Sequence, residues 1–133
     1  MSAPGHRILL VEDNPGCSSF MHTVLSREGY AVTTCGSARE ALEALEMAPA
    51  DLIITDLCMP ELSGLDVVRA LREAVDGTPI LVSSAIYIPS MREETLNAGA
   101  SDALGKPFTY WELLDSVSAL LRGASSRSVV SCQ

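Results

Sequence analysis

Short apolar runs alternate along this chain with stretches in which apolar residues recur at intervals of three and four. This alternation limits the possible folds more than any other feature of the sequence. The runs predict strands at residues 8–11, 31–35, 52–55, 80–83 and 102–104. Strands that are apolar at nearly every position are typical of parallel sheets buried on both faces. The alternation therefore predicts an α/β fold: a doubly wound five-stranded parallel sheet inside a three-layer α/β/α sandwich.

The stretches between the predicted strands carry helical signals. Asn14 is placed to cap a first helix with Pro15 at its first position, and Gly29 is placed to end it. The other helical stripes comprise Ala38, Ala41, Leu42 and Leu45, then Leu65, Val68 and Leu71, then about residues 89–98, and finally Leu113, Leu114, Val117, Leu120 and Leu121. The fourth helix is the least amphipathic, and we therefore expect it to be mobile.

One domain accounts for nearly the whole chain, because 133 residues with 47% hydrophobic side chains suit a single core. We expect this domain at residues 6–122 and a flexible tail or the start of a linker at residues 123–133. A net charge of −8 argues against nucleic acid and anionic membrane as direct partners. No long apolar run or signal peptide is visible, which favours a cytoplasmic protein.

Polar side chains follow four of the predicted strands. They are Glu12 and Asp13 after the first, Asp56 after the third, Ser83 and Ser84 at the end of the fourth, and Lys106 after the fifth. Each alone has a structural explanation, such as a helix cap or a surface lysine. Ligands of doubly wound sheets bind outside the carboxyl ends of the strands, however, so the coincidence of these polar residues favours a site there.

The chemistry of these side chains indicates a phosphoryl site with a metal ion. Three carboxylates that converge raise one another's pKa unless a cation lies among them. Mg²⁺ fits best, because it accepts one or two protein carboxylates together with water and a phosphoryl oxygen. Asp56 is then an available nucleophile, while the metal and Lys106 neutralise the phosphoryl group and a serine hydroxyl donates to it.

Four motifs resemble those of the receiver domains of two-component response regulators. The motifs are Val11-Glu12-Asp13-Asn14, Asp56-Leu57-Cys58-Met59-Pro60 followed by Gly64, Ser84-Ala85, and Gly99-Ala100-Ser101-Asp102 through Lys106-Pro107-Phe108. They occur in the family's order and spacing, and the resemblance covers residues 6 to about 122. The resemblance implies a flavodoxin-like fold with strand order 2-1-3-4-5.

The same resemblance implies a role for each site residue. It implies that Asp56 is phosphorylated, that Ser84 follows the phosphoryl group and that Lys106 pairs with it. It implies a Mg²⁺ site formed by Glu12, Asp13, Asp56 and the backbone carbonyl of Cys58. A cis peptide bond between Lys106 and Pro107 is implied as well.

The function implied by the resemblance is a phosphorylation-dependent signalling switch. Such a domain accepts a phosphoryl group from a sensor histidine kinase or a histidine phosphotransfer protein and catalyses only its own phosphorylation and dephosphorylation. The new charge changes the surface read by a downstream protein partner or a fused output domain. A stand-alone regulator and a piece of a longer protein both fit this sequence.

Two positions leave alternatives open. Ser83 and Ser84 can each supply the hydroxyl, and Ser84 is preferred because the small Ala85 beside it leaves room for a phosphoryl group. Ala103 departs from the family pattern, which usually has Tyr or Phe three residues before the lysine. This favours, as an alternative, a degenerate receiver that binds partners without phosphorylation. In a working switch we expect residues 84–87 and the fourth helix to move, with Tyr87 changing its packing.

Other functional classes fit less well. A phosphatase of the haloacid dehalogenase type needs a second Asp two positions after its nucleophile, where this chain has Cys58. A nucleotide-binding loop needs a hydroxyl residue after its lysine, where Pro107 stands. A flavodoxin-like electron carrier shares the fold class, but clustered carboxylates repel a flavin phosphate.

Overall fold

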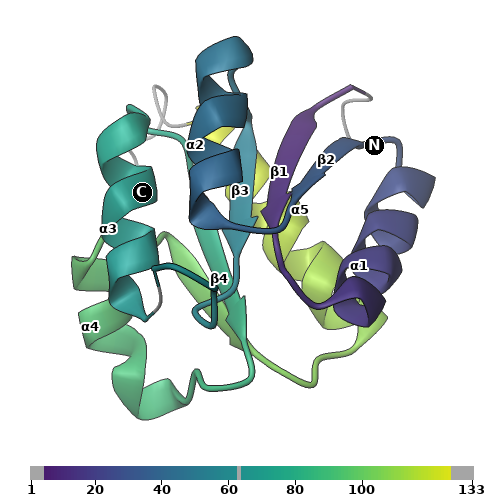
Figure 1. Cartoon of the computed structure of the whole chain (residues 1–133). Coiled ribbons are helices and arrows are strands. Elements are labelled where there is room, and N and C mark those ends of the chain that lie inside the picture. The colour runs from purple at the N-terminus through teal and green to yellow at the C-terminus, as the bar shows by residue number, and fades with distance from the viewer. Residues whose placement is uncertain (1–4, 63, 127–133) are drawn as a thin grey trace.

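A parallel sheet lies between two layers of helices (Figure 1). The structure is a computed structural model that describes residues 5–62 and 64–126. The strands are β1 (Arg7–Val11), β2 (Ala31–Cys35), β3 (Leu52–Thr55), β4 (Ile80–Ser84) and β5 (Asp102–Gly105). They pair in parallel in the order β2-β1-β3-β4-β5. The predicted five-stranded doubly wound sheet, with strand order 2-1-3-4-5, is therefore confirmed.

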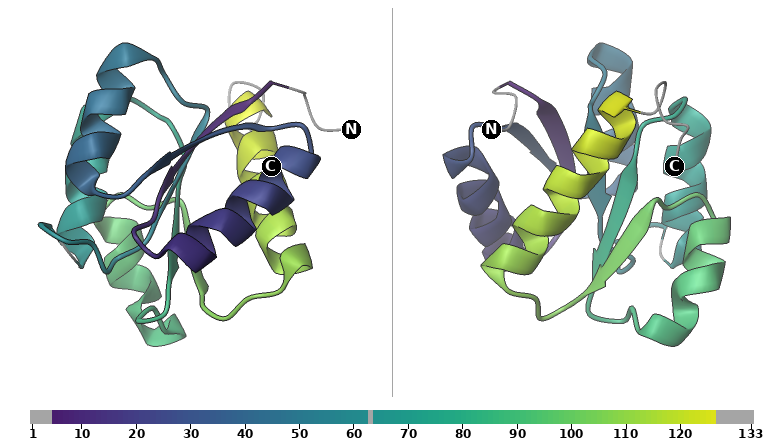
Figure 2. Two further views of the ribbon diagram at one scale, coloured as in Figure 1. Left: turned by 45° about the vertical axis from the view of Figure 1, so that its right-hand side comes forward. Right: turned by 180° about the vertical axis from the view of Figure 1, so that it is seen from behind.

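The helices divide between the two faces of the sheet. They are α1 (Pro15–Arg27), α2 (Ala38–Met47), α3 (Leu65–Ala74), α4 (Arg92–Asn97) and α5 (Tyr110–Ser126), with a short 3₁₀ helix η1 (Pro89–Met91) before α4. The turned views show α1 and α5 on one face, and α2, α3 and α4 on the other (Figure 2). Each crossover between parallel strands is right-handed. A helix therefore lies on one face where the next strand is added on one side of the sheet, and on the other face where it is added on the opposite side.

The core consists of two apolar layers, one on each face of the sheet. The layer under α1 and α5 is built from Ile8, Leu10, Met21, Val24, Leu25, Tyr30, Leu52, Ile54, Leu81, Leu113, Val117 and Leu121. The layer under α2 and α3 is built from Leu9, Val11, Cys35, Ala38, Ala41, Ile53, Met59, Val67, Leu71 and Ile80. Alternate residues of one strand thus enter opposite layers. Every residue of β3 and β4 is buried, as expected for central strands.

The first helix begins and ends where the sequence signals predict. The side chain of Asn14 accepts a hydrogen bond from the backbone N–H of Cys17 at 2.9 Å, and Pro15 occupies the first turn. Gly29 has a φ of 94°, a left-handed conformation that closes the helix cheaply only with glycine. This cap fixes the direction of α1 immediately after the acidic pair.

The last two helices differ from the expectation. The fourth predicted helix is a 3₁₀ turn followed by six α-helical residues, of which only Thr95 is buried. The helix α5 continues to Ser126, past the boundary expected between residues 122 and 123; the division of the chain into a domain and a tail or linker stays a prediction. A helix propagates at little cost once it is nucleated, so it need not stop where its apolar stripe stops. The rest of the predicted tail, residues 127–133, lies outside the described residues.

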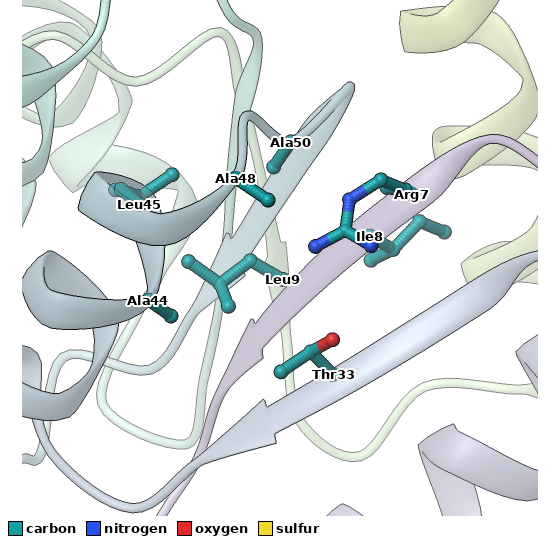
Figure 3. A pocket seen from close by; sticks show the side chains of 8 residues that line it. All are labelled: Arg7, Ile8, Leu9, Thr33, Ala44, Leu45, Ala48 and Ala50. Carbon is teal, nitrogen blue, oxygen red and sulfur yellow. The ribbon is translucent and has the colours of Figure 1, made fainter.

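The amino ends of the strands enclose a small hollow between β1, β2 and the end of α2 (Figure 3). Its walls are Arg7, Ile8, Leu9, Thr33, Ala44, Leu45, Ala48 and Ala50, and it is partly open to solvent with a volume of about 10 Å³, barely room for one water molecule. The Arg7 side chain donates a hydrogen bond to the carbonyl of Pro49 at 3.0 Å. The hollow therefore has mainly apolar walls, and its one charged group already has a partner. Among the described residues, no helix is long and apolar enough to cross a membrane.

Candidate functional site

Asp56 directly follows the carboxyl end of β3, and its carboxylate is held in place by backbone groups. Oδ1 accepts hydrogen bonds from the N–H groups of Leu57 at 2.6 Å and Cys58 at 3.1 Å. The Asp56 backbone N–H donates to the carbonyl of Val11 at 3.0 Å, which ties this residue to the end of β1. Only 6% of the Asp56 surface is exposed. The carboxylate is thus both buried and fixed in orientation.

The turn after Asp56 is shaped by Gly64. The N–H of Gly64 donates to the carbonyl of Leu57 at 2.6 Å and closes the loop back onto the strand end. Gly64 has a φ of 65° and directly precedes α3, so its lack of a side chain permits this turn. The loop therefore returns to the sheet without covering the Asp56 carboxylate with a helix.

Lys106 joins the two buried carboxylates of the site. Its Nζ donates to Oε1 of Glu12 at 2.7 Å and to Oδ2 of Asp56 at 3.1 Å. Glu12 is 4% exposed, and its Oε2 accepts from the N–H of Asn14 at 3.1 Å. Residues from the ends of β1 and β3 and from the segment after β5 thus meet at one point, as the sequence predicted. The peptide bond between Lys106 and Pro107 is cis, and this expectation is also confirmed.

The two serines at the end of β4 have different surroundings. The Ser84 hydroxyl lies close enough to Asp56 to lower the pKa of that carboxyl, and it accepts a hydrogen bond from the N–H of Ile86 at 3.3 Å. The Ser83 hydroxyl is buried and has no hydrogen-bond partner within the described part of the chain. Successive residues of a strand point to opposite faces, so only one of the two can face Asp56. Ser84 is that residue.

The electrostatics of the site are set by Lys106 and by hydrogen bonding. Burial acts to raise the pKa of Asp56, but hydrogen bonds from Ser84, from the backbone of Cys58 and from Lys106 outweigh it and hold the pKa below its ordinary value. Burial likewise acts to lower the pKa of Lys106, and Glu12, Cys17 and Asp56 together raise it well above the usual range. The site therefore holds an ionised carboxylate beside a permanently charged ammonium.

The two acids after β1 differ in burial. Asp13 is exposed, whereas Glu12 beside it is buried against Lys106. The expected convergence of Asp13 with Glu12 and Asp56 stays a prediction. In residues 5–62 and 64–126, no three side chains of the metal-binding types come close enough to enclose an ion. The pKa of Asp56 is lowered by Ser84, by the backbone of Cys58 and by Lys106, rather than raised by neighbouring acids.

The donor groups nevertheless fit Mg²⁺. Two carboxylates facing one ammonium leave a net charge of −1, and the exposed Asp13 beside them adds another negative charge. Mg²⁺ keeps several water ligands and binds through one or two carboxylates, so it needs no closed protein cage. Carboxylate oxygens at this edge of the sheet therefore suit a hydrated divalent cation. The predicted ligand role of the Cys58 carbonyl stays a prediction.

Cys17 belongs to none of the motifs of the sequence, but it lies beside the site. Its thiol is a hydrogen-bonding neighbour of Lys106, and it also packs against Met21 at a sulfur–sulfur distance of 3.9 Å. Burial raises the pKa of this thiol, against the opposing effect of Lys106. The available signal was its position in the first turn of α1, three residues after the Asn14 cap, which directs the side chain toward the strand ends.

Comparison with known proteins agrees with this geometry. A family model described as the response regulator receiver domain matches residues 8–118. Response regulator MprA from Mycolicibacterium vanbaalenii is 42% identical over 116 residues, which make up 87% of this chain and 50% of that protein. The chain thus spans about half the length of the curated relatives it matches.

Solved structures show the same fold. The chemotaxis protein CheY4 of Vibrio cholerae is 32% identical, with a TM-score of 0.80 over 89% of this chain and 99% of that one. The receiver domain of a sensor histidine kinase from Pseudomonas aeruginosa PAO1 is also 32% identical, with a TM-score of 0.79 over 89% of this chain and 98% of that one. The latter structure has a magnesium ion coordinated in its active site cleft.

Proposed function

This chain belongs to the family of response regulator receiver domains, and from that premise we propose that it is a phosphorylation-dependent signalling switch. The phosphoryl group is accepted by Asp56 and comes from a sensor histidine kinase or a histidine phosphotransfer protein. The reaction requires Mg²⁺, and the domain modifies only itself, while the donor is released without its phosphoryl group. A change in the surface read by a protein partner or a fused output domain carries the signal onward.

The observation that carries this proposal is the arrangement of groups around Asp56. One carboxylate oxygen is fixed by two backbone N–H groups, and the other faces the Lys106 ammonium at 3.1 Å. A structural ion pair needs neither the Ser84 hydroxyl beside the same carboxylate nor two buried acids on one lysine. A carboxylate nucleophile of fixed orientation, a cation and a hydroxyl donor are the parts that phosphoryl transfer requires.

These residues act by positioning and by charge compensation. A carboxylate oxygen of Asp56 forms a bond to phosphorus as the phosphorus–nitrogen bond of the donor breaks, and the electron pair of that bond returns to the imidazole. Lys106 stays protonated because its pKa is raised, so it offsets the negative charge of the phosphoryl oxygens throughout. The Ser84 hydroxyl is placed to donate to one of those oxygens.

Mg²⁺ would be held by Glu12, Asp13, Asp56 and the backbone carbonyl of Cys58. When bound, it neutralises the carboxylates and the phosphoryl oxygens that approach them. Asp13 is the exposed member of this set and is accessible to a hydrated ion from solvent. The magnesium ion in the related Pseudomonas aeruginosa receiver domain supports this part of the proposal.

Phosphoryl uptake tests the proposal directly. The chain is incubated with a small phosphodonor such as acetyl phosphate, with Mg²⁺ or with a chelator, and intact mass is measured. We expect one phosphoryl group to be added in the presence of Mg²⁺ and none with the chelator. The Asp56→Asn variant is expected to take up none, because an amide is not a comparable nucleophile.

Asp51→Asn is the matched control. It makes the same chemical change at the opposite end of β3, where the carboxylate accepts only the N–H of Arg7 at 2.7 Å. This variant is expected to be phosphorylated like the wild type. Wild-type uptake by Asp56→Asn would refute the assignment of Asp56. No uptake by the unmodified chain would favour the alternative, an interaction module that works without phosphorylation.

A further inference from the structure

The strand β2 forms one edge of the sheet, beside α1 (Figure 1). Within the described residues, no further strand pairs with its outer side. The backbone N–H of Ala31 and the backbone carbonyl of Cys35 bond to the residues that flank β1, at 2.9 Å in each case. Because alternate residues of an edge strand bond to the neighbouring strand, the N–H and C=O groups of Val32 and Thr34 point away from β1. Each of these two residues therefore presents a donor and an acceptor at the open edge.

The sequence of β2 has none of the features that protect a sheet edge. Natural sheets protect an exposed edge with charged side chains, proline or a bulge. β2 has five residues without a charge or a proline, namely Ala31, Val32, Thr33, Thr34 and Cys35. The other edge strand, β5, begins with Asp102 in an ion pair with Arg92 at 2.8 Å, and it ends directly before Lys106 and Pro107. The two edges of the sheet are therefore not equivalent.

A groove lies between α1 and β2. It has a volume of about 200 Å³, is open to solvent, and is lined by Ser18, Ser19, His22, Thr23 and Thr34. We name it the β2 groove. Thr34 faces this groove and Thr33 faces the hollow of about 10 Å³ on the opposite face, as the alternation of strand side chains requires. Of the two spaces beside β2, only the groove is large enough to take side chains.

The β2 groove lies where the side chains of an added strand would go. Neighbouring strands lie about 4.8 Å apart, and their side chains alternate between the two faces of the sheet. A strand that pairs with Val32 and Thr34 therefore places every second side chain beside the Thr34 side chain, on the face covered by α1. Thr34 thus supplies both a wall of the groove and a pair of outward backbone groups.

The walls of the groove indicate the chemistry of its occupant. They comprise four hydroxyl side chains and one imidazole, with no carboxylate, ammonium or guanidinium among them. Small polar side chains that exchange hydrogen bonds with hydroxyls suit such walls. The chain as a whole has a net charge of −8, which attracts basic segments and repels acidic ones. The groove and the charge together favour an extended segment with small polar side chains and basic flanks.

A second copy of this chain suits the edge less well. A two-fold axis would pair two β2 strands antiparallel and keep both α1 helices on the same face of the joined sheet. The polar walls of the two grooves would then meet, although stable dimers bury an apolar core. Two chains that each have a charge of −8 also repel each other.

We propose that the open edge of β2 is a docking site for an extended basic segment of a partner protein, which adds to the sheet as a further strand and places small polar side chains in the β2 groove. In strand addition, main-chain hydrogen bonds supply the affinity, and pockets for alternate side chains supply the specificity. The site involves neither Asp56 nor Lys106, so the inference does not depend on the proposed phosphorylation.

Amide hydrogen exchange by NMR tests the proposal on the full chain. The probe is a synthetic peptide in which threonine and valine alternate between lysines at both ends. At saturating peptide we expect exchange at the amides of Val32 and Thr34 to slow at least about fivefold, because each gains a hydrogen bond. The amide of Thr33 is an internal control, because it faces β1, and its exchange should change less than about twofold. Unchanged exchange at Val32 and Thr34, or no binding of the peptide, would overturn the proposal.

Thr34→Pro removes one outward donor, at an edge position where proline is tolerated because its nitrogen does not bond to the neighbouring strand. We expect this variant to bind the peptide about fivefold more weakly, as measured by titration of amide shifts. Thr34→Val is the matched control. It keeps the N–H and the β-branched shape and loses only the hydroxyl, so its affinity should stay within about twofold of the wild type. Wild-type affinity in Thr34→Pro would contradict the proposal.

Methylated peptides give the same test without altering the chain, in case thermal unfolding shows that Thr34→Pro disturbs the fold. Two versions of the probe carry N-methyl groups on alternate amides, one version on each set. Only one set can face β2, so we expect one version to lose binding and the other to keep it. Equal binding of the two versions would rule out strand addition.

Two further measurements identify the occupant. A probe with glutamates in place of the lysines should bind about tenfold more weakly at low salt, and equal binding would refute the basic character of the partner. In the chain without peptide, exchange at Val32 and Thr34 should not depend on protein concentration. Slower exchange at higher concentration, together with a dimer in sedimentation, would assign the edge to a second copy and overturn the proposal.

Discussion

The two ends of the same sheet are built from the same strands but carry opposite chemistry. At the carboxyl end, Glu12 and Asp56 are buried and share the ammonium of Lys106. At the amino end, small and aliphatic side chains surround a partly open hollow, with Arg7 bonded to a backbone carbonyl at its rim (Figure 3). The hollow and the buried charged side chains thus lie at opposite ends of the sheet.

The difference shows that this hollow is not a guide to the site. Packing alone explains the hollow, because short alanine side chains at the end of α2 leave space against β1. Packing alone cannot explain two buried carboxylates, because burial of a charge costs free energy unless a partner compensates it. The buried carboxylates at the carboxyl end of the sheet therefore cost free energy, and folding by itself does not require them.

The largest expected effect on stability comes from removing the shared cation. Lys106→Met keeps a side chain of similar length but leaves Glu12 and Asp56 buried without their ammonium. We expect the free energy of unfolding at neutral pH to fall by about 3 kcal/mol, measured by urea denaturation. The difference from the wild type should shrink as the pH falls, because protonation removes the uncompensated negative charge.

Arg69→Met is the control for this variant, because it removes a cation from an exposed pair within α3. It should cost less than about 1 kcal/mol. Equal losses of unfolding free energy in the two variants would mean that the ion pairs at the carboxyl end contribute no more than an exposed surface pair. The contrast between the two ends of the sheet would then lose its energetic basis.

A smaller effect is expected from acid. The pKa of Asp56 is lower in the folded chain than its ordinary value of 3.8, so its ionised form contributes stability above that value. This contribution is lost as the pH falls through the folded pKa. Asp56→Asn lacks this contribution, so the stability of the variant relative to the wild type should rise as the pH falls. Thermal unfolding measured across a range of pH checks this. Asp51→Asn, at the amino end, should show no such gain, and a parallel gain would assign the effect to net charge instead.

The smallest effect is expected at the hollow. Ala48 has an extended backbone and precedes Pro49, a position that suits a β-branched residue. Ala48→Val adds two methyl groups to the space and should raise the free energy of unfolding by about 0.5–1 kcal/mol. Phosphoryl uptake measured by intact mass should not change. An altered uptake would mean that the two ends of the sheet are coupled, which the separation described above does not predict.

Much of this molecule follows from local features of the sequence. The apolar runs and the polar residues after them fix the sheet, its strands and the end at which the site lies, because both patterns depend on neighbouring residues alone. The start of α1 follows in the same way from Asn14 and Pro15. The end of α5 at Ser126 does not follow in this way, because a missing core stripe does not end a helix that is already formed.

The pairing of charges was decided only by the tertiary structure. Lys106 is 94 residues from Glu12 and 50 from Asp56, and nothing in the sequence states that its ammonium reaches both. Nor does the sequence state that Asp13 faces solvent while Glu12 does not, because the two acids are equivalent until the strand end gives each a direction. Tyr87 is similar, since its burial depends on a glycine eighteen residues later that lies on the neighbouring strand. The patterns that predict strands depend on neighbouring residues, whereas contacts between distant segments exist only once the chain has folded.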